Sequence, residues 1–259
     1  MNNFYPSERE SDHTTGPAPK GRLTDHLSFA DTSAGRAAAH FLRRYESKAN
    51  AAGIQLEMHT DFEEFEKVAR TLEGKGAVSP PFLPRFSDIG PVNGFWLKGL
   101  DPRGDVVQIQ AVRVDDLTGN SLANHMRTLN FFYSDPAKSA HPQETCRVDA
   151  PASSGISGRV CYQGEFWIKG GKNGYRGHAF ATIFLRIGMA VALARWDPDF
   201  IYATVASVLV EKGVVARYGY HNLQPHGIVW STPQNEDVMD EWIMWLSWRE
   251  LVDLIERSN

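Results

Sequence analysis

The chain has 259 residues, a length that suits one large domain better than two complete domains. Apolar residues make up 42% and charged residues 22%, so we expect a globular protein, and wholly disordered and fibrous classes are excluded. The formal net charge is -4 and no window is strongly basic, which argues against nucleic acid as a partner because phosphate recognition needs clustered positive charge.

Cysteine content and hydropathy indicate in which cellular compartment we expect the protein. Cys146 and Cys161 are too few for a disulfide scaffold or a cysteine-rich zinc site, so we expect two reduced cysteines. The polar N-terminus lacks the apolar segment of a secretory signal. The longest apolar run, 179–194, contains Arg186 and is too short to span a bilayer. We therefore expect a cytoplasmic protein with no membrane partner.

The first quarter of the chain predicts a tail, a helix and a strand–helix unit. Residues 1–25 lack periodicity and are expected to form a mobile tail. Residues 33–51 are alanine-rich and helical in pattern. Alternation over 54–58 predicts a half-buried strand, and helical spacing over 62–72 predicts a helix. Thr60 and Glu63 fit a capping box at the start of this helix.

The middle of the chain is less regular. Residues 73–92 are rich in proline and glycine and predict a loop. Strands at 94–100 and 106–114 flank a turn and predict a hairpin. Residues 117–157 are difficult to interpret: 124–133 fits a short helix or a strand, and the rest resembles a loop that is unusually long for a compact domain.

The last hundred residues alternate clearly between strands and helices. The expected order is strand 159–168, glycine-rich loop 169–177, helix 179–196, strand 200–206, helix 207–217, strand 227–231, strand 242–246 and a final helix to Arg257. Ser247 and Glu250 fit a capping box for that last helix. Hairpins mixed with strand–helix–strand units indicate an α+β fold with a mixed sheet.

The glycine-rich loop before helix 179–196 is the segment most suggestive of chemistry. Free backbone N–H groups and the positive end of the helix dipole form a potential anion site there. The spacing of its glycines matches neither a P-loop nor a Rossmann fingerprint. The sequence also lacks the nucleophile-elbow and zinc-protease motifs.

This segment resembles the phosphate loop of the GNAT superfamily of N-acetyltransferases, whose pattern is [RQ]-x-x-G-x-[GA]. The sequence Arg176-Gly177-His178-Ala179-Phe180-Ala181 matches the first and sixth positions, and Ala179 stands where the family has glycine. The elements from 54 to 259 follow the family order apart from 117–157. The resemblance implies one domain over 26–259 with a central mixed, mostly antiparallel sheet flanked by helices, an N-terminal extension and an insertion.

The same resemblance implies acetyl-CoA, or another acyl-CoA, as co-substrate. Its pyrophosphate is expected at the cofactor-binding residues Arg176, Gly177, His178, Ala179, Phe180 and Ala181. The strand before the loop is expected to splay from its neighbour and to bind the pantetheine arm through the backbone of Phe166, Trp167 and Ile168. A backbone N–H in that strand is expected to polarise the thioester carbonyl.

Acyl transfer to an amine also needs a base and an acid. Glu165 lies on the same strand and is the expected base, with a paired or solvent-facing carboxylate as the alternative. Tyr218 and Tyr220 are the expected acids for the departing thiolate, with simple packing as the alternative. The tyrosine that commonly acts as acid in the family corresponds to Val215 here.

The expected activity is acetyl transfer to a small-molecule or peptide amine in a ternary complex. The alternative is a GNAT-like protein that binds acyl-CoA without catalysis, and a homodimer remains open. Trp242, Trp245 and Trp248 are expected to pack in the core rather than to form an aromatic box. His221 and His226 lack further ligands, so no metal is expected.

Overall fold

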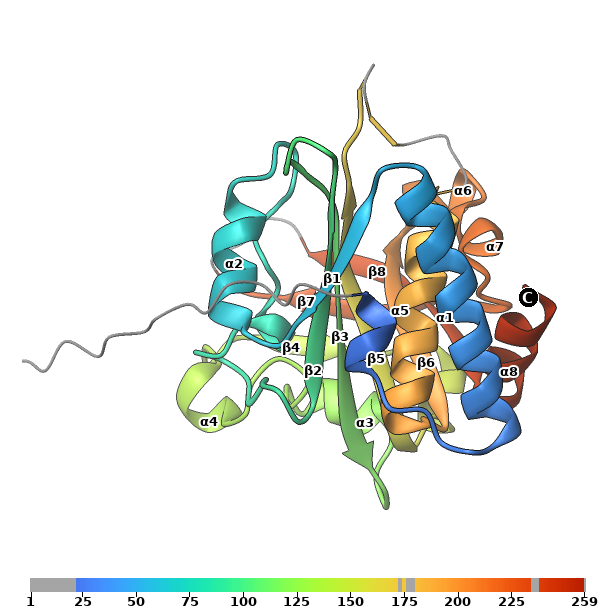
Figure 1. Cartoon of the computed structure of the whole chain (residues 1–259). Coiled ribbons are helices and arrows are strands. Elements are labelled where there is room, and N and C mark those ends of the chain that lie inside the picture. The colour runs from blue at the N-terminus through green and yellow to red at the C-terminus, as the bar shows by residue number, and fades with distance from the viewer. Residues whose placement is uncertain (1–21, 172–173, 176–179, 234–237, 259) are drawn as a thin grey trace, which may run out of the picture.

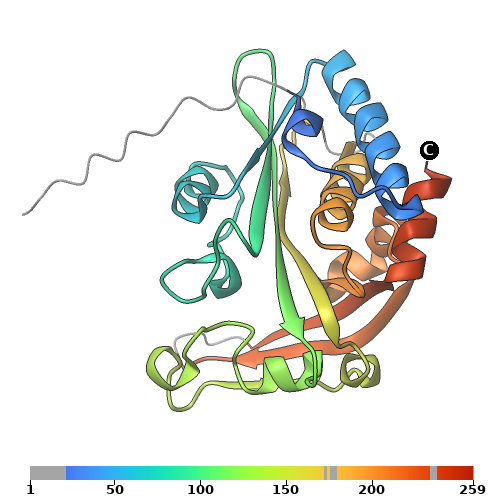
Figure 2. The same cartoon turned by 60° about the horizontal axis from the view of Figure 1, so that its bottom comes forward.

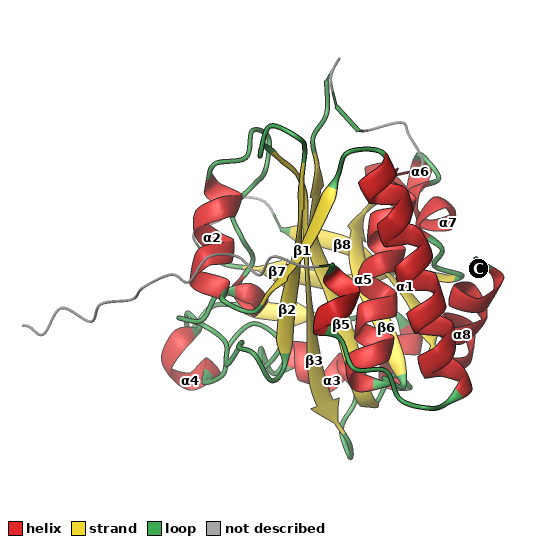
Figure 3. Cartoon of the chain, in the orientation of Figure 1, coloured by secondary structure: helices red, strands yellow, loops and turns green. Residues whose placement is uncertain are grey.

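The computed structural model of the chain describes residues 22–171, 174–175, 180–233 and 238–258. These residues form an eight-stranded sheet in the order β1-β2-β3-β5-β6-β8-β7-β4, with helices on both faces (Figures 1 and 3). Strands β5 and β6 run parallel, and the other described neighbours run antiparallel. The predicted α+β class with a mixed, mostly antiparallel sheet is confirmed.

The boundaries of the elements follow the sequence pattern closely in most places. The strands are β1 (Gln55–His59), β2 (Gly94–Leu100), β3 (Val106–Leu117), β4 (Thr145–Arg147), β5 (Gly158–Ile168), β6 (Phe200–Ala206), β7 (Asn222–Ser231) and β8 (Met239–Ser247). The α-helices are α1 (Ser33–Ala51), α2 (Phe62–Arg70), α3 (Leu122–Arg127), α4 (Pro136–Ser139), α5 (Phe180–Trp196), α6 (Ser207–Glu211), α7 (Val214–Tyr218) and α8 (Trp248–Arg257). The described residues also form the short 3-10 turns η1 (Leu23–His26), η2 (Pro80–Phe82) and η3 (Pro151–Ser154).

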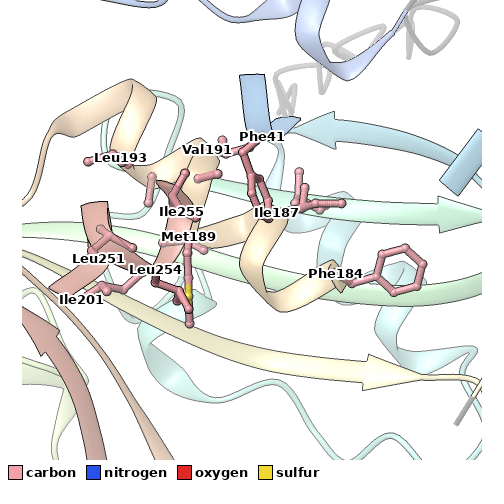
Figure 4. Close-up of a cluster of buried hydrophobic side chains, with 14 of the residues drawn as sticks. Phe41, Phe184, Ile187, Met189, Val191, Leu193, Ile201, Leu251, Leu254 and Ile255 are labelled. Atoms are coloured by element: carbon pink, nitrogen blue, oxygen red, sulfur yellow. The ribbon is translucent and has the colours of Figure 1, made fainter. Parts of the chain in front are cut away.

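Helices α1, α5 and α8 cover one face of the sheet. Helix α5 lies between the sheet and α1, which explains why it is apolar on nearly all sides. Its Ile187 and Val191 lie beside Phe41 of α1 in the buried cluster of Figure 4, which also contains Phe184. Helix α1 is therefore a full member of the core rather than an appended helix. Within the described ranges, no helix has both the length and the apolar character that crossing a membrane requires.

The opposite face is covered by α2 and by the segment between β3 and β5. This segment contains α3, α4, β4 and η3, and β4 extends the sheet by pairing with β7 (Figure 2). Its apolar side chains join those of α2 and η2 in a second buried cluster. The expectation of a loop over most of 117–157 is wrong, because short elements with buried side chains such as Leu122 and Phe132 build a layer there.

Three other predictions need correction. The N-cap of α2 is Asp61, whose carboxylate accepts hydrogen bonds from the N–H groups of Glu63 and Glu64, so the capping box at Thr60 is wrong. The single helix expected over 207–217 is two helices, because Gly213 adopts φ +66° and ends the first one. The capping box of Ser247 and Glu250 is confirmed.

The predicted mobile tail, residues 1–25, includes a few residues that the structure describes. Residues 1–21 lie outside the described residues, but Leu23 is buried beneath α1 and belongs to the core. The carboxylate of Glu46 in α1 accepts hydrogen bonds from the backbone N–H groups of Leu23 and Thr24. The prediction is therefore wrong for residues 22–25, which are held against the first helix.

Candidate active site

The parallel strands β5 and β6 separate soon after they begin. They pair only where Val160–Tyr162 lies beside Phe200–Tyr202. Beyond this point β5 pairs with β3 alone, and β6 pairs with β8 alone. Among the described residues, no strand covers the edge of β5 from Gln163 to Trp167 that faces β6. The sequence resemblance predicted such a splay, and here it follows from the strand register.

A β-bulge in β5 lies inside the splay. Ala111 of β3 pairs with Gly164 and Ile109 pairs with Trp167, so Glu165 and Phe166 together face Gln110. The backbone of Glu165 adopts φ +59°, a left-handed conformation that is unfavourable for residues other than glycine. The bulge places Glu165 on the α2 face of the sheet and turns the Phe166 side chain to the α5 face.

The splay opens into a cavity of about 310 Å³ that passes between the strands from one face of the sheet to the other. Gly164 forms part of its wall, and a Cβ atom there would lie 2.8 Å from Cε2 of Phe82, so only glycine fits. Residues on the α5 face include Phe166, Leu185, Tyr218 and Met244. Residues on the other face include Phe131, Phe132, Trp230 and Glu241.

The predicted base, Glu165, lines this cavity, but both of its carboxylate oxygens already have partners. Its Oε2 lies 2.6 Å from Nζ of Lys75. Its Oε1 accepts hydrogen bonds from the Ser79 backbone N–H at 2.9 Å and from the Ser79 hydroxyl at 2.5 Å. The two charged side chains are only 10% and 7% exposed. This arrangement corresponds to the paired-carboxylate alternative, and it fixes the loop 75–79 beside the cavity.

A second carboxylate, Glu241 of β8, lies in the same cavity. Burial raises the pKa of Glu241, a hydrogen bond from Thr204 lowers it, and the negative charge of Glu165 raises it, with a net upward shift. A carboxylate with a raised pKa in a cavity is a candidate proton acceptor. Sequence reasoning missed Glu241, although an acidic residue directly before the apolar run 242–246 was a usable signal.

Tyr218 is the predicted acid that the structure brings to the site. It is the last residue of α7 and lines the cavity beside Phe166, with the two rings edge to face at 5.9 Å between centroids. Val215 is buried one turn earlier in the same helix. Tyr218 therefore places a phenol on the α5 face of the splay in spite of valine at the family position.

Tyr220, the other predicted acid, lies in the core and does not line the cavity. It is 2% exposed, and its hydroxyl donates a hydrogen bond to Oε1 of Gln163 at 2.9 Å. Burial raises the pKa of Tyr220 well above its usual value. The prediction that Tyr220 acts as acid is wrong for this structure, because the hydroxyl is enclosed and occupied.

The network that includes Tyr220 holds α5 against the sheet. Nε2 of Gln163 donates to the carbonyl of Leu185 and to Oε1 of Gln110, both at 2.9 Å. Nε2 of Gln110 donates to the carbonyl of Phe184 at 2.6 Å. Strands β3 and β5 thus set the position of the first turns of α5, where the phosphate loop is expected to end.

The structure describes five of the nine expected cofactor-binding residues. Arg176, Gly177, His178 and Ala179 lie outside the described residues, so the pyrophosphate site there remains a prediction. Phe180 begins α5 and stacks on Phe184 at 5.7 Å between ring centroids. Ala181 packs against the α5-face core. The side chains of Phe180 and Ala181 therefore contribute packing, and only their backbone remains a candidate for ligand binding.

The other residues that the sequence singled out make packing contacts and hydrogen bonds. The indole of Trp167 points to the α2 face and donates to the carbonyl of Glu73 at 3.1 Å, while Ile168 belongs to the α5-face core. Trp242 and Trp245 pack on opposite faces of β8, whereas Trp248 is 41% exposed, so the expectation of core packing is wrong for Trp248. His226 bonds Asp240, and in the described parts of the chain no cluster of three metal-ligating side chains occurs.

Comparison with known proteins gives likenesses at the level of structure. Neither a family model nor a curated protein matches the sequence. Arabidopsis thaliana NAA60 in complex with acetyl-CoA matches 75% of this chain and 98% of its own, with 12% identity and a TM-score of 0.41. FeeM, an N-acyl amino acid synthase from uncultured soil microbes, matches 76% of this chain and 92% of its own, with 12% identity and a TM-score of 0.45.

A GNAT family acetyltransferase from Streptococcus pneumoniae matches 74% of this chain and 99% of its own, with 10% identity and a TM-score of 0.38. The resemblance to GNAT acetyltransferases that the sequence suggested is thus found again in solved structures. At such identities and TM-scores these likenesses carry no weight for activity or substrate, which have to be argued from the geometry of this chain.

Proposed function

We propose that the chain is an acyl-CoA-dependent N-acyltransferase that transfers an acetyl group from acetyl-CoA to a primary amine. The observation that carries the proposal is the splay of β5 from β6 over a cavity that crosses the sheet. The pantetheine arm of coenzyme A contains two amides, and a strand edge without a partner strand can bind such groups as it would bind an added strand.

The bulge at Glu165 and Phe166 supports the same reading. A bulge removes backbone groups from the regular ladder, so an N–H in this stretch is available to an acceptor other than β3. An N–H that points to the thioester oxygen stabilises the charge that develops there during attack. This role uses the backbone, which is why the identity of the side chains in β5 gives little indication of it.

Glu241 is the base in this proposal, and Glu165 is a positioning residue. An amine reaches the site mainly as an ammonium ion and must lose a proton before it attacks. The oxygens of Glu165 already accept from Lys75 and Ser79, whereas burial raises the pKa of Glu241 and favours proton uptake there. Glu165 then holds the loop 75–79 in place beside the cavity.

The proton balance assigns a role to Tyr218. The amine nitrogen forms the C–N bond as the C–S bond breaks, and coenzyme A leaves as thiolate. Of the three protons of the ammonium ion, one stays on the amide, one reaches solvent through Glu241 and one ends on the thiol. Tyr218 lies on the α5 face of the splay, where it can donate a proton to the thiolate and recover one from the amine.

Two measurements test this proposal. Calorimetric titration with acetyl-CoA measures binding, and release of the free thiol in the presence of amines measures turnover. We expect Glu241→Gln to lower kcat by about 100-fold, the lower range of general-base contributions, with little change in acetyl-CoA affinity. Glu211→Gln is the matched control, since Glu211 is exposed at the end of α6 and should leave both quantities unchanged.

The outcomes separate the two readings that the sequence left open. Binding of acetyl-CoA with thiol release on an amine supports the acyltransferase. Binding without turnover on any amine favours a protein that binds acyl-CoA without catalysis. Absence of binding contradicts both, and equal loss of kcat in both variants contradicts the role of Glu241.

A further inference from the structure

The cavity has an aromatic wall on the face of the sheet opposite α5, formed by Phe131, Phe132, Tyr162 and Trp230. Phe132 stacks on Trp230 with ring centroids 4.4 Å apart and an angle of 20° between the rings. Phe131 packs edge to face against Phe132 and Tyr162, each at 4.9 Å. A wall of packed aromatic rings is suited to binding an apolar group about the size of one ring.

Buried polar contacts fix this wall in place. The indole N–H of Trp230 donates to Oε1 of Glu144 at 2.7 Å, and the Tyr133 hydroxyl donates to the same carboxylate at 3.0 Å. Glu144 is 9% exposed, so both bonds are largely shielded from water. The wall is therefore preformed, and a group that fits it need not order these side chains on binding.

The charged side chains among the described residues that line the cavity are two carboxylates, Glu165 and Glu241. Among the described residues that line it there is no lysine, arginine or histidine. Of the two carboxylates, Glu165 is neutralised by Lys75 at 2.6 Å. Among the described residues, no cationic side chain influences the ionisation of Glu241. The described lining of the cavity therefore offers one uncompensated carboxylate and no cationic partner for an anion.

We infer that the acceptor is a monoamine carried on an apolar, ring-sized body, the class to which arylalkylamines belong. This inference rests on the proposed acyl transfer and specifies its acceptor. The amine lies at Glu241, and the body lies against the aromatic wall. Among the described residues, neither a second cationic group nor a carboxylate on the acceptor would find a counter-charge, so we expect polyamines and free amino acids to be poor acceptors.

The test compares amines that differ by one feature on the wild-type protein. With acetyl-CoA fixed, 2-phenylethylamine is compared with phenylalanine, which adds a carboxylate, with ethylamine, which lacks the ring, and with 1,4-diaminobutane, in which a second amine group replaces the ring. We expect kcat/KM for 2-phenylethylamine to exceed each of the others by about 100-fold, the upper range for a group that fills an apolar pocket.

A substitution in the aromatic wall tests whether the wall determines the preference among amines. Trp230→Leu removes one face of the wall, and we expect it to raise KM for 2-phenylethylamine about tenfold while KM for acetyl-CoA stays unchanged. Trp248→Leu is the matched control, because Trp248 is 41% exposed and lies outside the cavity. Equal effects of the two variants would overturn the assignment of the wall to the acceptor.

The remaining outcomes separate this inference from the proposed function. Turnover that is fastest with the diamine or the amino acid overturns the inference and leaves the acyltransferase intact. A preference for decanoyl-CoA over acetyl-CoA with no preference among amines assigns the wall to the acyl chain and also overturns it. If no amine is acylated, calorimetry with 2-phenylethylamine decides: binding weakened by Trp230→Leu supports the apolar amine site, and absence of binding refutes it.

Discussion

Glu241 carries a carboxylate at a position where burial opposes its ionisation. The raised pKa means that the folded chain keeps a proton that the unfolded chain has already released. The stability associated with this proton is fully present below the pKa of an ordinary glutamate, about 4.3, and is lost as pH rises through the raised value. A group that acts as base at neutral pH therefore destabilises the fold there.

We expect Glu241→Gln to melt at a higher temperature than the wild type at pH 8, by about 2–4 °C, the shift that 1 kcal/mol gives in a chain of this size. The difference should shrink toward pH 4, where both side chains are neutral. Thermal melts across this range check the trend, with Glu211→Gln as control. A difference that grows toward acid would show that Glu241 is stabilised as an anion.

The ion pair of Lys75 and Glu165 gives a second prediction at the level of single residues. Lys75→Met should lower the free energy of unfolding by about 3 kcal/mol, because it leaves the Glu165 charge buried and without its cation. Adding Glu165→Gln removes that charge and should restore part of the loss. Urea unfolding of the two single variants and the double variant measures the coupling; strictly additive losses would show that the pair is unimportant.

Sequence reasoning found part of the site at this scale. Glu165, Phe166 and Tyr218 were identified, and all three line the cavity. Tyr220 was misassigned because chain position near a glycine turn does not reveal which way a hydroxyl points. Glu241 was missed because its burial depends on the pairing of β8 with β6, a contact between segments separated in sequence by α6, α7 and β7.

Helix α5 is positioned by an unusually close approach to the strands beneath it. A Cβ atom at Gly188 would lie 2.3 Å from Oε1 of Gln110 and 2.8 Å from Nε2 of Gln163. These two amides also hold the carbonyls of Phe184 and Leu185. Glycine at position 188 lets α5 pack directly on Gln110 and Gln163. This contact fixes the direction of the first turns of the helix.

We expect Gly188→Ala to destabilise the protein by about 2 kcal/mol, the usual result of overpacking, although alanine in place of glycine normally favours a helix by about 1 kcal/mol. Acetyl-CoA affinity should fall as well, since α5 shifts. Gly76→Ala is the control, because a Cβ atom at Gly76 meets nothing within 4 Å. Urea unfolding and calorimetry measure both effects, and a stabilised Gly188→Ala protein would contradict this packing.

Most elements could be predicted because their patterns are local. The alternation in β1, the hairpin of β2 and β3, and the spacing in α5 all indicated the right structure. The division of 207–217 at Gly213 and the layer between β3 and β5 could not be predicted with equal success. Short helices such as α3 have too few turns for a clear period, and they are stabilised by contacts with distant strands.

At the scale of the whole molecule, both faces of one sheet carry buried clusters, so the segment between β3 and β5 should unfold together with the rest. We expect Leu122→Ala in α3 to lower the global free energy of unfolding by about 3 kcal/mol, with circular dichroism and fluorescence changing in one transition. The exposed Val92→Ala is the control. Two separate transitions would show that this segment is an independent unit.

The splay between β5 and β6 is the feature on which the proposed function depends most. Ala206 lines the cavity at the end of β6, and Ala206→Trp should fill it with little disturbance of the fold. Ala137→Trp on the exposed surface of α4 is the matched control.

Calorimetric titration with acetyl-CoA is the most direct measurement. We expect saturable binding to the wild type and to Ala137→Trp, and at least about a tenfold loss of affinity in Ala206→Trp, since one displaced group of contacts is worth 1–3 kcal/mol. Unchanged binding in Ala206→Trp, with its melting temperature preserved, would contradict the splay as the acyl-CoA site.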